Sequence, residues 1–600
     1  MTDATHKAPL SRTAKRGLLR RLLGYILENA PLALLAVAVS LVSNYLALLG
    51  PRYLGRAIDA IQTDTGVQMP VVWQSFWGML ICYGCAAVLS YVQTLVMVTL
   101  GQRITYRMRR QLFEHLTALP VSYFDTHTTG DIVSRISYDI DTVNASLSTD
   151  LIQVLTSICT VLGSLWFMLK ISRPLILVFA VTVPISLMFT RLKAKKIQPL
   201  FRARSRKLGE LNGFAEEMLS GEQTIGAYQQ AENMTARFDE RNRAAVDAYY
   251  HAEYYGAMIG PSVNFINNLS LSLVMIFGGI LYLYSQNGTV SAGSAWFITM
   301  GGVTQFVMYS RKFAGPINEF ANIVNEFQSA FSAAERIFRI IDEAPEQPDA
   351  PDAETLADVQ GDVALRNVSF GYTPARTVLH DLTLHAAPGQ TIAVVGPTGA
   401  GKTTLINLLM RFYDVNAGEI DVDGHEIRQL TRSSLRGAYT MVLQDTWLFR
   451  GTVYDNIAYG RPDATPEEVV DAAKAAHIHS FIMRLPNGYQ TMLADDGLNV
   501  SKGQKQLITI ARAMLPHTQM LILDEATSNV DSRTEQQIQA AMNELMRGRT
   551  CFVIAHRLST VQHADCILVM QHGRVIERGS HSELMTRGGF YASLYQSQFK

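Results

Sequence analysis

The residues best suited to chemistry form one glycine-rich segment that runs from Thr391 to Thr404. It reads as a buried strand, then the pattern GxxxxGK[ST], then a helical run. Glycines at this spacing let backbone N–H groups turn inward around phosphates at a helix N-terminus. Lys402 would meet the β and γ phosphates of a nucleotide, and Thr403 would offer its hydroxyl to Mg²⁺. The pattern predicts a phosphate site made of Gly396, Pro397, Thr398, Gly399, Ala400, Gly401, Lys402, Thr403 and Thr404.

Two adjacent carboxylates could provide a Mg²⁺ ligand and a group that activates water, neither of which a phosphate site alone contains. Asp524 and Glu525 close the apolar run Met520–Leu523, roughly 120 residues after the glycine-rich segment. The first carboxylate can hold the Mg²⁺ shell, and the second can polarise a water in line with the γ phosphate. Together with the phosphate site, the pair predicts hydrolysis of a nucleotide with Mg²⁺ as a bound ion.

The elements that must position these residues alternate between strands and helices. We expect strands at Val368–Tyr372, Thr391–Val395, Met520–Leu523 and Cys551–Ala555, and helices over 402–412, 464–476, 502–515 and 533–547. Such alternation favours an α/β P-loop NTPase domain. A proline-rich, acidic stretch at 342–352 predicts a linker before it, since prolines there prevent a regular helix or strand.

The first half of the chain contains long stretches without charged residues. Stretches without Asp, Glu, Lys or Arg run over 29–51, 65–102, 151–169, 174–190 and 254–310. A membrane span needs about 20 apolar residues, so the first four stretches hold one helix each. The last is broken by the polar turn 285–294 and holds two. The sequence therefore predicts six membrane-spanning helices.

Charge distribution sets the topology and excludes one class of partner. Basic residues crowd the N-terminus and the long connections 103–150 and 191–253, which predicts that these segments and the nucleotide domain are cytoplasmic. Lys plus Arg equals Asp plus Glu at 52 each, so the chain lacks the basic excess of a nucleic-acid binder. Five scattered cysteines form no disulfide framework, and Cys82 and Cys85 are expected to be packing residues.

Taken together, these motifs identify the chain as resembling ATP-binding cassette (ABC) exporters, in the form of a half-transporter with six spans followed by a nucleotide domain. The resemblance covers nearly all of residues 20–600. It implies an adenine-stacking role for Tyr372, a Mg²⁺-contacting glutamine at Gln444 and a switch histidine at His556. It also implies a D-loop ending in Asp531 and a signature motif that faces the partner's ATP, formed by Ser501, Lys502, Gly503 and Gln504.

The signature departs from the family's Leu-Ser-Gly-Gly-Gln at Val500 and Lys502. Each ATP site in the family joins the P-loop and glutamate of one subunit to the signature of the other. An intact Glu525 beside an altered signature therefore implies unequal sites and a heterodimer with a second half-transporter whose glutamate is replaced. A homodimer that tolerates Lys502 is the alternative. Segments 123–131 and 221–228 resemble the parts that bear the family's coupling helices.

The resemblance implies a multi-pass inner or plasma membrane protein that exports a small amphipathic, drug-like or lipid-like substrate by alternating access. Its expected parts are a cytoplasmic tail (1–20), a membrane domain (21–330), a linker (331–360) and an ATP-binding cassette (361–600). The alternatives are a homodimeric lipid or peptide exporter, an importer of metal chelates and an ATP-gated regulator. Polar residues within the spans either line a substrate path or bond between helices; they are Asn44, Gln93, Asn264, Asn267, Asn268 and Gln305.

Overall fold

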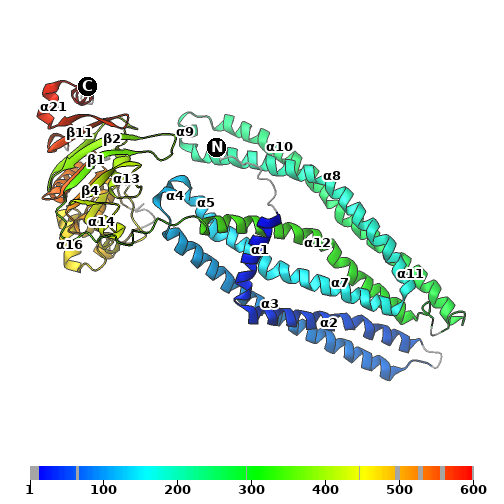
Figure 1. Ribbon diagram of the computed structural model, residues 1–600. Helices are drawn as coiled ribbons and strands as arrows, with labels where there is room; N and C mark the ends of the chain where they lie inside the picture. Colours follow the sequence, from blue (N-terminus) through cyan, green and yellow to red (C-terminus); the bar gives the residue numbers. More distant parts are fainter. Residues whose placement is uncertain are drawn as a thin grey trace. The chain divides into compact units, whose positions relative to one another are not determined.

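The computed structural model describes residues 12–62, 66–291, 294–444, 446–493, 500–524, 531–554 and 561–597. The chain forms two compact units (Figure 1). One contains Met1–Thr117 and Thr129–Glu343 and is helical. The other contains Ala344–Lys600 together with the short segment Ala118–Thr128 from the first half of the chain.

Long helices build the first unit. Its elements are α1 (Arg12–Leu27), α2 (Ala30–Ile61), α3 (Met69–Thr117), α5 (Thr129–Ser134), η1 (Arg135–Asp139), α6 (Ile140–Ala145), η2 (Ser146–Asp150), α7 (Leu151–Ile171), α8 (Arg173–Ser220), α9 (Glu222–Ala227), α10 (Ala231–Ala257), α11 (Ile259–Gln286) and α12 (Met300–Ile341). The segments η1 and η2 are single π-helical turns within an otherwise continuous helical run.

Five helical stretches in the described part of the chain are long and apolar enough to cross a membrane. They are Ala30–Ile61, Met69–Thr117, Thr129–Ile171, Arg173–Ser220 and Ala231–Gln286. The sixth predicted span falls at the start of α12, which packs along α2 and α7. Only Ser172 separates α7 from α8. The long connections are helical continuations of the spans, as α3 and α8 show.

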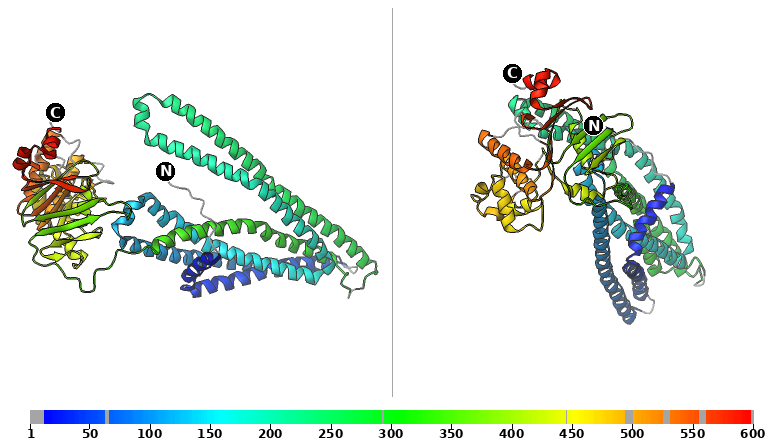
Figure 2. Two further views of the ribbon diagram at one scale, coloured as in Figure 1. Left: turned by 45° about the horizontal axis from the view of Figure 1, so that its top comes forward. Right: turned by 60° about the vertical axis from the view of Figure 1, so that its left-hand side comes forward.

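Two groups of helices pack within this unit. Helices α2 and α3 lie side by side, as do α7 and α12, while α8 pairs with α10 and α11. The α8–α9–α10 hairpin stands apart from the other long helices toward its α9 end (Figure 2). A buried aromatic core joins α7 and α12, where the rings of Phe167 and Tyr309 stack with their centroids 4.9 Å apart. The Tyr309 hydroxyl donates a hydrogen bond of 2.6 Å to the carbonyl of Leu48 on α2.

An ion pair with a buried carboxylate and a partly exposed arginine ties η1 to α12. Arg336 Nε donates to Asp139 Oδ2 at 2.8 Å, and Nη2 donates to the other carboxylate oxygen. The Asp139 side chain is 4% exposed and that of Arg336 is 43% exposed. Such a bidentate pair is directional, and removal of one partner leaves the other charge partly desolvated.

Asp139→Ala is therefore expected to lower the free energy of unfolding by about 2 kcal/mol, below the usual value for fully buried pairs because Arg336 keeps contact with solvent. Thermal unfolding of the detergent-solubilised chain measures this change. The control is Glu114→Ala, which breaks the exposed Arg110–Glu114 pair and should change stability by less than about 0.5 kcal/mol. Equal shifts in the two variants would contradict the assignment.

The second unit is an α/β domain. Its strands are β1 (Val363–Phe370), β2 (Leu379–Ala386), β3 (Thr391–Val395), β4 (Ala417–Val422), β5 (His425–Glu426), β6 (Tyr439–Val442), β7 (Gly451–Thr452), β8 (Met492–Leu493), β9 (Met520–Asp524), β10 (Thr550–Ile554), β11 (Cys566–Gln571) and β12 (Arg574–Gly579). Its helices are α4 (Val121–Thr126), α13 (Lys402–Leu409), α14 (Arg432–Ala438), α15 (Val453–Ala458), α16 (Pro466–Ala475), α17 (His479–Ile482), η3 (Gly488–Gln490), α18 (Lys502–Met514), α19 (Ser532–Met546), α21 (His581–Arg587) and α22 (Phe590–Ser597).

Two sheets organise this unit. The larger has the order β12-β11-β3-β10-β9-β6, and all its neighbours are parallel except β11 and β12. The smaller, β2-β1-β4-β5, is antiparallel. Strands β3, β9 and β10 are buried almost throughout, which suits parallel strands covered on both faces. One apolar core lies on each side of the larger sheet.

The acidic linker and α4 are both held by side chains of this unit. Arg436 Nη2 donates to Glu346 Oε1 at 2.6 Å, and Arg432 Nη1 donates to Asp349 Oδ1 at 2.8 Å. The Tyr413 hydroxyl donates to the Asp125 carboxylate of α4. Burial and this carboxylate together raise the pKa of Tyr413. A segment of the first cytoplasmic connection is therefore part of the α/β unit.

Candidate active site: the phosphate loop and its strand edge

The loop between β3 and α13 has a backbone that only glycine accommodates at two positions. At Gly396, φ is 155° and a Cβ atom would lie 2.2 Å from the carbonyl oxygen of Met570. At Gly401, φ is 98° and a Cβ atom would lie 2.6 Å from Leu379 Cδ2. Gly401 is also the N-cap of α13. The loop therefore turns tightly and brings backbone N–H groups to a helix N-terminus, where anions are stabilised.

Lys402 is the first residue of α13 and folds back over this loop. Its Nζ donates to the carbonyl oxygens of Gly396 at 2.7 Å and Pro397 at 3.1 Å. Burial lowers the pKa of Lys402, and the charge of Asp524 partly opposes that shift. The ammonium group thus lies between the loop and an acidic strand end, where a phosphate oxygen would be a better partner than two neutral carbonyls.

The register of the parallel sheet brings the other predicted residues to the same edge. Asp524 pairs with Ile554 across β9 and β10, and Val442 of β6 pairs with Leu523. Gln444 follows β6 by two residues, so it leaves the sheet at the edge where β3 enters the phosphate loop. Ligands of open α/β sheets bind at this carboxyl edge. Glu525 and His556 lie outside the described residues.

Tyr372 lies beside the phosphate loop. Its hydroxyl is 3.2 Å from Thr404 Oγ1 and accepts a hydrogen bond of 3.3 Å from Asn407 Nδ2. The ring meets Phe370 and Tyr413 edge to face, with centroids 5.0 Å apart in both cases. The side chain is 46% exposed, so part of its ring remains available for stacking.

The signature residues form the N-terminus of α18. Ser501 and Gln504 make a reciprocal capping box, with hydrogen bonds of 3.3 Å from Gln504 N to Ser501 Oγ and 2.9 Å from Ser501 N to Gln504 Oε1. Lys502 is exposed at the first helical position, whereas Gly503 is buried. In the described part of the chain, no hydrogen bond or ion pair joins Ser501–Gln504 to the phosphate loop, so the chain does not bring these two predicted groups together.

Asp531, the last D-loop residue, caps α19. Its Oδ1 accepts a hydrogen bond of 3.0 Å from Thr534 N. The backbone and side-chain hydrogen bonds of Thr534 lower the pKa of Asp531. This carboxylate is therefore ionised at neutral pH and fixes where α19 begins.

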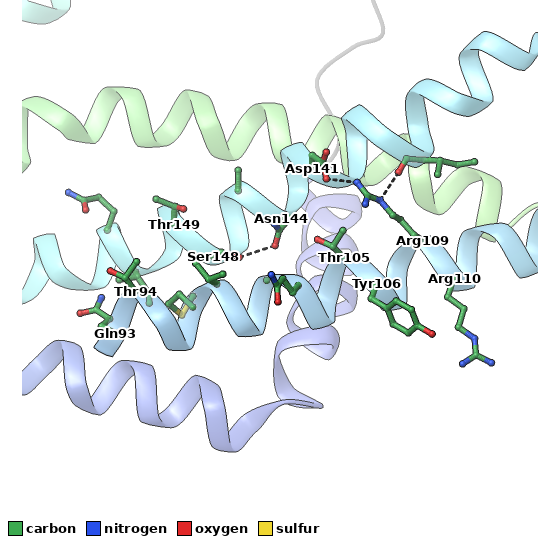
Figure 3. A pocket seen from close by; sticks show the side chains of 18 of the residues that line it. Gln93, Thr94, Thr105, Tyr106, Arg109, Arg110, Asp141, Asn144, Ser148 and Thr149 are labelled. Carbon is green, nitrogen blue, oxygen red and sulfur yellow. Dashed lines mark hydrogen bonds and ion pairs between the residues drawn. The ribbon is translucent and has the colours of Figure 1, made fainter. Parts of the chain in front are cut away.

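Two cavities in the helical unit are lined by some of the polar residues that the sequence places within the spans. The larger, of about 1010 Å³, lies between α3 and the run from η1 to α7, and Gln93 lines it (Figure 3). The other, of about 440 Å³, lies among α8, α11 and α12 and is lined by Asn264, Asn267 and Asn268. Asn44 instead accepts a hydrogen bond of 3.2 Å from Thr160, and Gln305 packs against Gly55. These last two residues connect helices.

Charged residues that the sequence analysis did not select also line these cavities. Arg109 Nη2 donates to Asp141 Oδ1 at 2.7 Å in the larger cavity (Figure 3), and Arg311 lines the smaller one. A search for uncharged stretches cannot select charged residues. Arg311 directly follows the last such stretch, 254–310. An arginine that close to an apolar run was the available signal.

Comparison with known proteins agrees with this arrangement. Residues 33–307 match the family model described as ABC transporter transmembrane region, and residues 379–528 match the one described as ABC transporter. The chain is 42% identical over 588 residues to the uncharacterised ABC transporter ATP-binding protein YfiC of Bacillus subtilis, covering 98% of this chain and 95% of that protein.

Two further relatives are a transporter and a solved structure. The chain is 44% identical over 526 residues to a fatty acid ABC transporter ATP-binding/permease protein of Mycobacterium bovis, covering 88% of this chain and 81% of that protein. It resembles the ATP-bound structure of a bacterial Atm1-family ABC exporter with a TM-score of 0.73 and 30% identity, over 97% and 98% of the two chains. The chain therefore belongs to the ABC transporter family, as an exporter-type half-transporter that fuses a multi-pass membrane domain to a cytoplasmic, ATP-hydrolysing domain.

Proposed function

We propose that the protein exports an amphipathic, lipid-like compound by alternating access, driven by ATP binding and hydrolysis. The observation that carries this proposal is the phosphate loop, whose glycines and Lys402 form an anion cradle. The same chain has, among its described residues, five helical stretches able to span a membrane. A transporter of this kind uses the difference in ATP affinity between its states to shift the helices. The domain limits given above are part of the proposal.

The residues present fit ATP and Mg²⁺. Thr403, Gln444 and Asp524 would hold the ion, which supplies electrostatic stabilisation to phosphate oxygens, and Mg²⁺ needs no more than one or two carboxylates besides phosphate and water. Glu525 would take the proton of the attacking water, while His556 would contact the γ phosphate. Lys402 would offset the negative charge of the phosphates, and the loop N–H groups would donate hydrogen bonds to them.

The substrate class rests on the two cavities and one relative. The smaller cavity combines three asparagines and Arg311 with the apolar side chains of Phe179, Val183 and Leu271. A cation and amides beside apolar walls suit a molecule with an anionic head and a hydrophobic body. The relative named for fatty acid transport has a substrate of that chemistry.

The test is ATPase activity of the chain reconstituted in lipid, alone and co-expressed with a second half-transporter as candidate partner, with and without fatty acids. Stimulation by an amphiphile supports the proposal. No stimulation by any amphiphile, together with unchanged amphiphile distribution across the vesicles during turnover, would contradict it.

Tyr372 provides a direct test of the nucleotide pocket. Tyr372→Ala is expected to raise the Kd for ATP about tenfold, since base stacking on an aromatic ring contributes roughly 1–3 kcal/mol. Tyr372→Phe keeps the ring and should bind ATP within about twofold of the wild type. Titration with a fluorescent ATP analogue measures both values. Equal losses in the two variants would assign the effect to the hydroxyl contact with Thr404 instead.

We further propose that the protein works in a heterodimer with unequal ATP sites. Lys502 stands at the first position of α18, where a cation is unfavourable beside the positive helix end and where a glycine would let the backbone approach a phosphate. The altered signature would therefore face the partner's P-loop in a site that binds ATP but turns it over poorly. Glu525 would serve the other site.

Lys502→Gly is expected to increase the number of nucleotides retained per dimer, because the poor site would gain a regular signature that approaches the phosphate. Turnover at that site should stay low, since the partner's glutamate is replaced. ATPase rates and the number of nucleotides retained per dimer measure this. If both stay as in the wild type, the sites are not unequal. Full activity of the chain without any partner would instead show a homodimer in which Lys502 is harmless.

A further inference from the structure

A third cavity in the helical unit has walls of apolar side chains. It holds about 430 Å³ between α8 and α11, and Leu177, Val181 and Phe277 are among the residues that line it. Among its described lining residues, only Thr182 and the indole of Trp296 carry polar side-chain atoms. We call this space the apolar cavity. Its chemistry suits a hydrocarbon and offers almost nothing to a polar ligand.

The apolar cavity adjoins the smaller of the two cavities described above. We call that one the asparagine cavity, after Asn264, Asn267 and Asn268. Thr182 lines both cavities. Its hydroxyl donates to the carbonyl of Val178 at 2.9 Å, so its oxygen accepts the hydrogen bond from Ser270 Oγ, 2.8 Å away. Both hydroxyl protons at the junction are therefore paired, and a hydrocarbon beside them would leave neither of them unsatisfied.

The asparagine cavity contains a cation without a counter-ion. Arg311 of α12 lines it and makes no ion pair with a residue that the structure describes. The described residues that line the two cavities include no Asp or Glu. A cation among membrane helices is costly unless it has a partner. An anionic group bound here would supply the missing charge, and the amides of Asn267 and Asn268 could donate further hydrogen bonds to it.

The two cavities lie at different heights on α11. Residues between Asn264 and Leu271 line the asparagine cavity, and residues between Leu273 and Leu281 line the apolar cavity. The helix rises roughly 15 Å from Asn267 to Phe277. Because α11 follows the cytoplasmic connection that contains α10, the asparagine cavity is the one nearer the cytoplasm. A head group there and a chain in the apolar cavity would have the orientation of a lipid in the cytoplasmic leaflet.

We propose that the two cavities form one bipartite site for the exported amphiphile. Its anionic head group binds Arg311 and the asparagines, and one alkyl chain occupies the apolar cavity. This inference rests on the export proposed above and adds the position and direction of the chain. The site therefore loads from the cytoplasmic leaflet without inverting the molecule. An apolar helix of a second subunit would fill the apolar cavity but would bring no anion to Arg311.

The test is photolabelling of the full-length chain in lipid nanodiscs without nucleotide. Two palmitate probes are compared, one with a diazirine at the end of the chain and one with a diazirine beside the carboxylate. Mass spectrometry locates the labelled peptides. We expect the chain-end probe to label residues around Val181 and Phe277, and the head-group probe to label residues around Asn267 and Arg311. Excess palmitate should remove both signals.

Two variants separate the chain from the head group. Val181→Trp should lower labelling by the chain-end probe at least about fivefold, because the indole fills space that the chain needs. The control is Val88→Trp on α3, which lies outside all three cavities and should label within about twofold of the wild type. Val181 and Val88 are similarly exposed, at 59% and 63%. Arg311→Gln should lower labelling by the palmitate probes about tenfold, as expected for loss of a charged hydrogen bond, but not labelling by their methyl esters.

Three results would overturn the inference. Equal labelling of α3 and the apolar cavity would show lipid that merely surrounds the helices, and identical peptides from both probes would show no fixed orientation. An unlabelled cavity, together with a crosslink from Val181→Cys to a second subunit, would show that a helix fills it. Cavity labelling without transport would contradict only the proposed export, whereas transport without cavity labelling would contradict only this inference.

Discussion

Lys402→Ala is expected to lower ATP turnover at least about a hundredfold, the usual effect of removing one preorganised charge from developing negative charge. The Lys402 ammonium lies within 2.7 Å of the loop carbonyl at Gly396 and carries the loop's positive charge. Nothing else on α13 replaces it, because the next two residues are threonines. Phosphate release by the purified, lipid-reconstituted protein measures the loss.

The matched control is Lys474→Ala, which removes an exposed lysine paired with Asp471 on α16. This variant should retain ATP turnover within about twofold, because the salt bridge is a surface pair. If Lys402→Ala retained more than a tenth of the wild-type rate while eluting as a folded protein, the assigned phosphate loop would be wrong.

Glu525→Gln is the second large effect, and it should separate binding from chemistry. A general base contributes about 10²- to 10⁴-fold, so turnover should fall by at least a hundredfold. The amide keeps the shape of the side chain, so ATP should still bind, with a Kd within a few-fold of the wild type. Turnover and retention of a fluorescent ATP analogue together measure this.

Lys402→Ala and Glu525→Gln should therefore differ in their effects on nucleotide binding. The lysine variant should lose nucleotide affinity as well as rate, whereas the glutamate variant should retain unhydrolysed nucleotide. Glu544→Gln, at a glutamate paired with Arg547 on α19, is the charge-matched control and should leave both quantities unchanged. Full turnover in Glu525→Gln would show that another residue activates the water.

The sequence predicted best those strands and helices of the α/β unit whose limits are set by nearby residues. The strand Thr391–Val395 lies where the sequence predicted it, and α16, α18 and α19 begin and end within about two residues of their predicted limits. The starts of α18 and α19 can be recognised in the sequence because Ser501 and Asp531 are N-cap residues. The antiparallel strands β2 and β4 were missed, because their register depends on partners far along the chain.

The membrane half shows the opposite limit. Missing charge located the apolar part of each span, yet α3 continues to Thr117 and α8 to Ser220, because charged cytoplasmic turns remain helical. Nor does the local sequence reveal the π-helical turn η1, which places Asp139 against Arg336, 197 residues away. Tertiary packing decides such features. Arg109 and Arg311, which line the cavities, were missed for a different reason, because a search for uncharged stretches cannot select charged residues.

The position of α4 has a consequence for the order of events on the ribosome. Its Asp125 bonds to Tyr413, 288 residues later in the chain. At 5 to 20 residues per second, translation takes roughly 15 to 60 s to produce that partner. A six-residue helix is far below the length at which a helix is stable alone. The newly made segment must therefore wait, unfolded and exposed to the cytoplasm, until the α/β unit is synthesised and completes it.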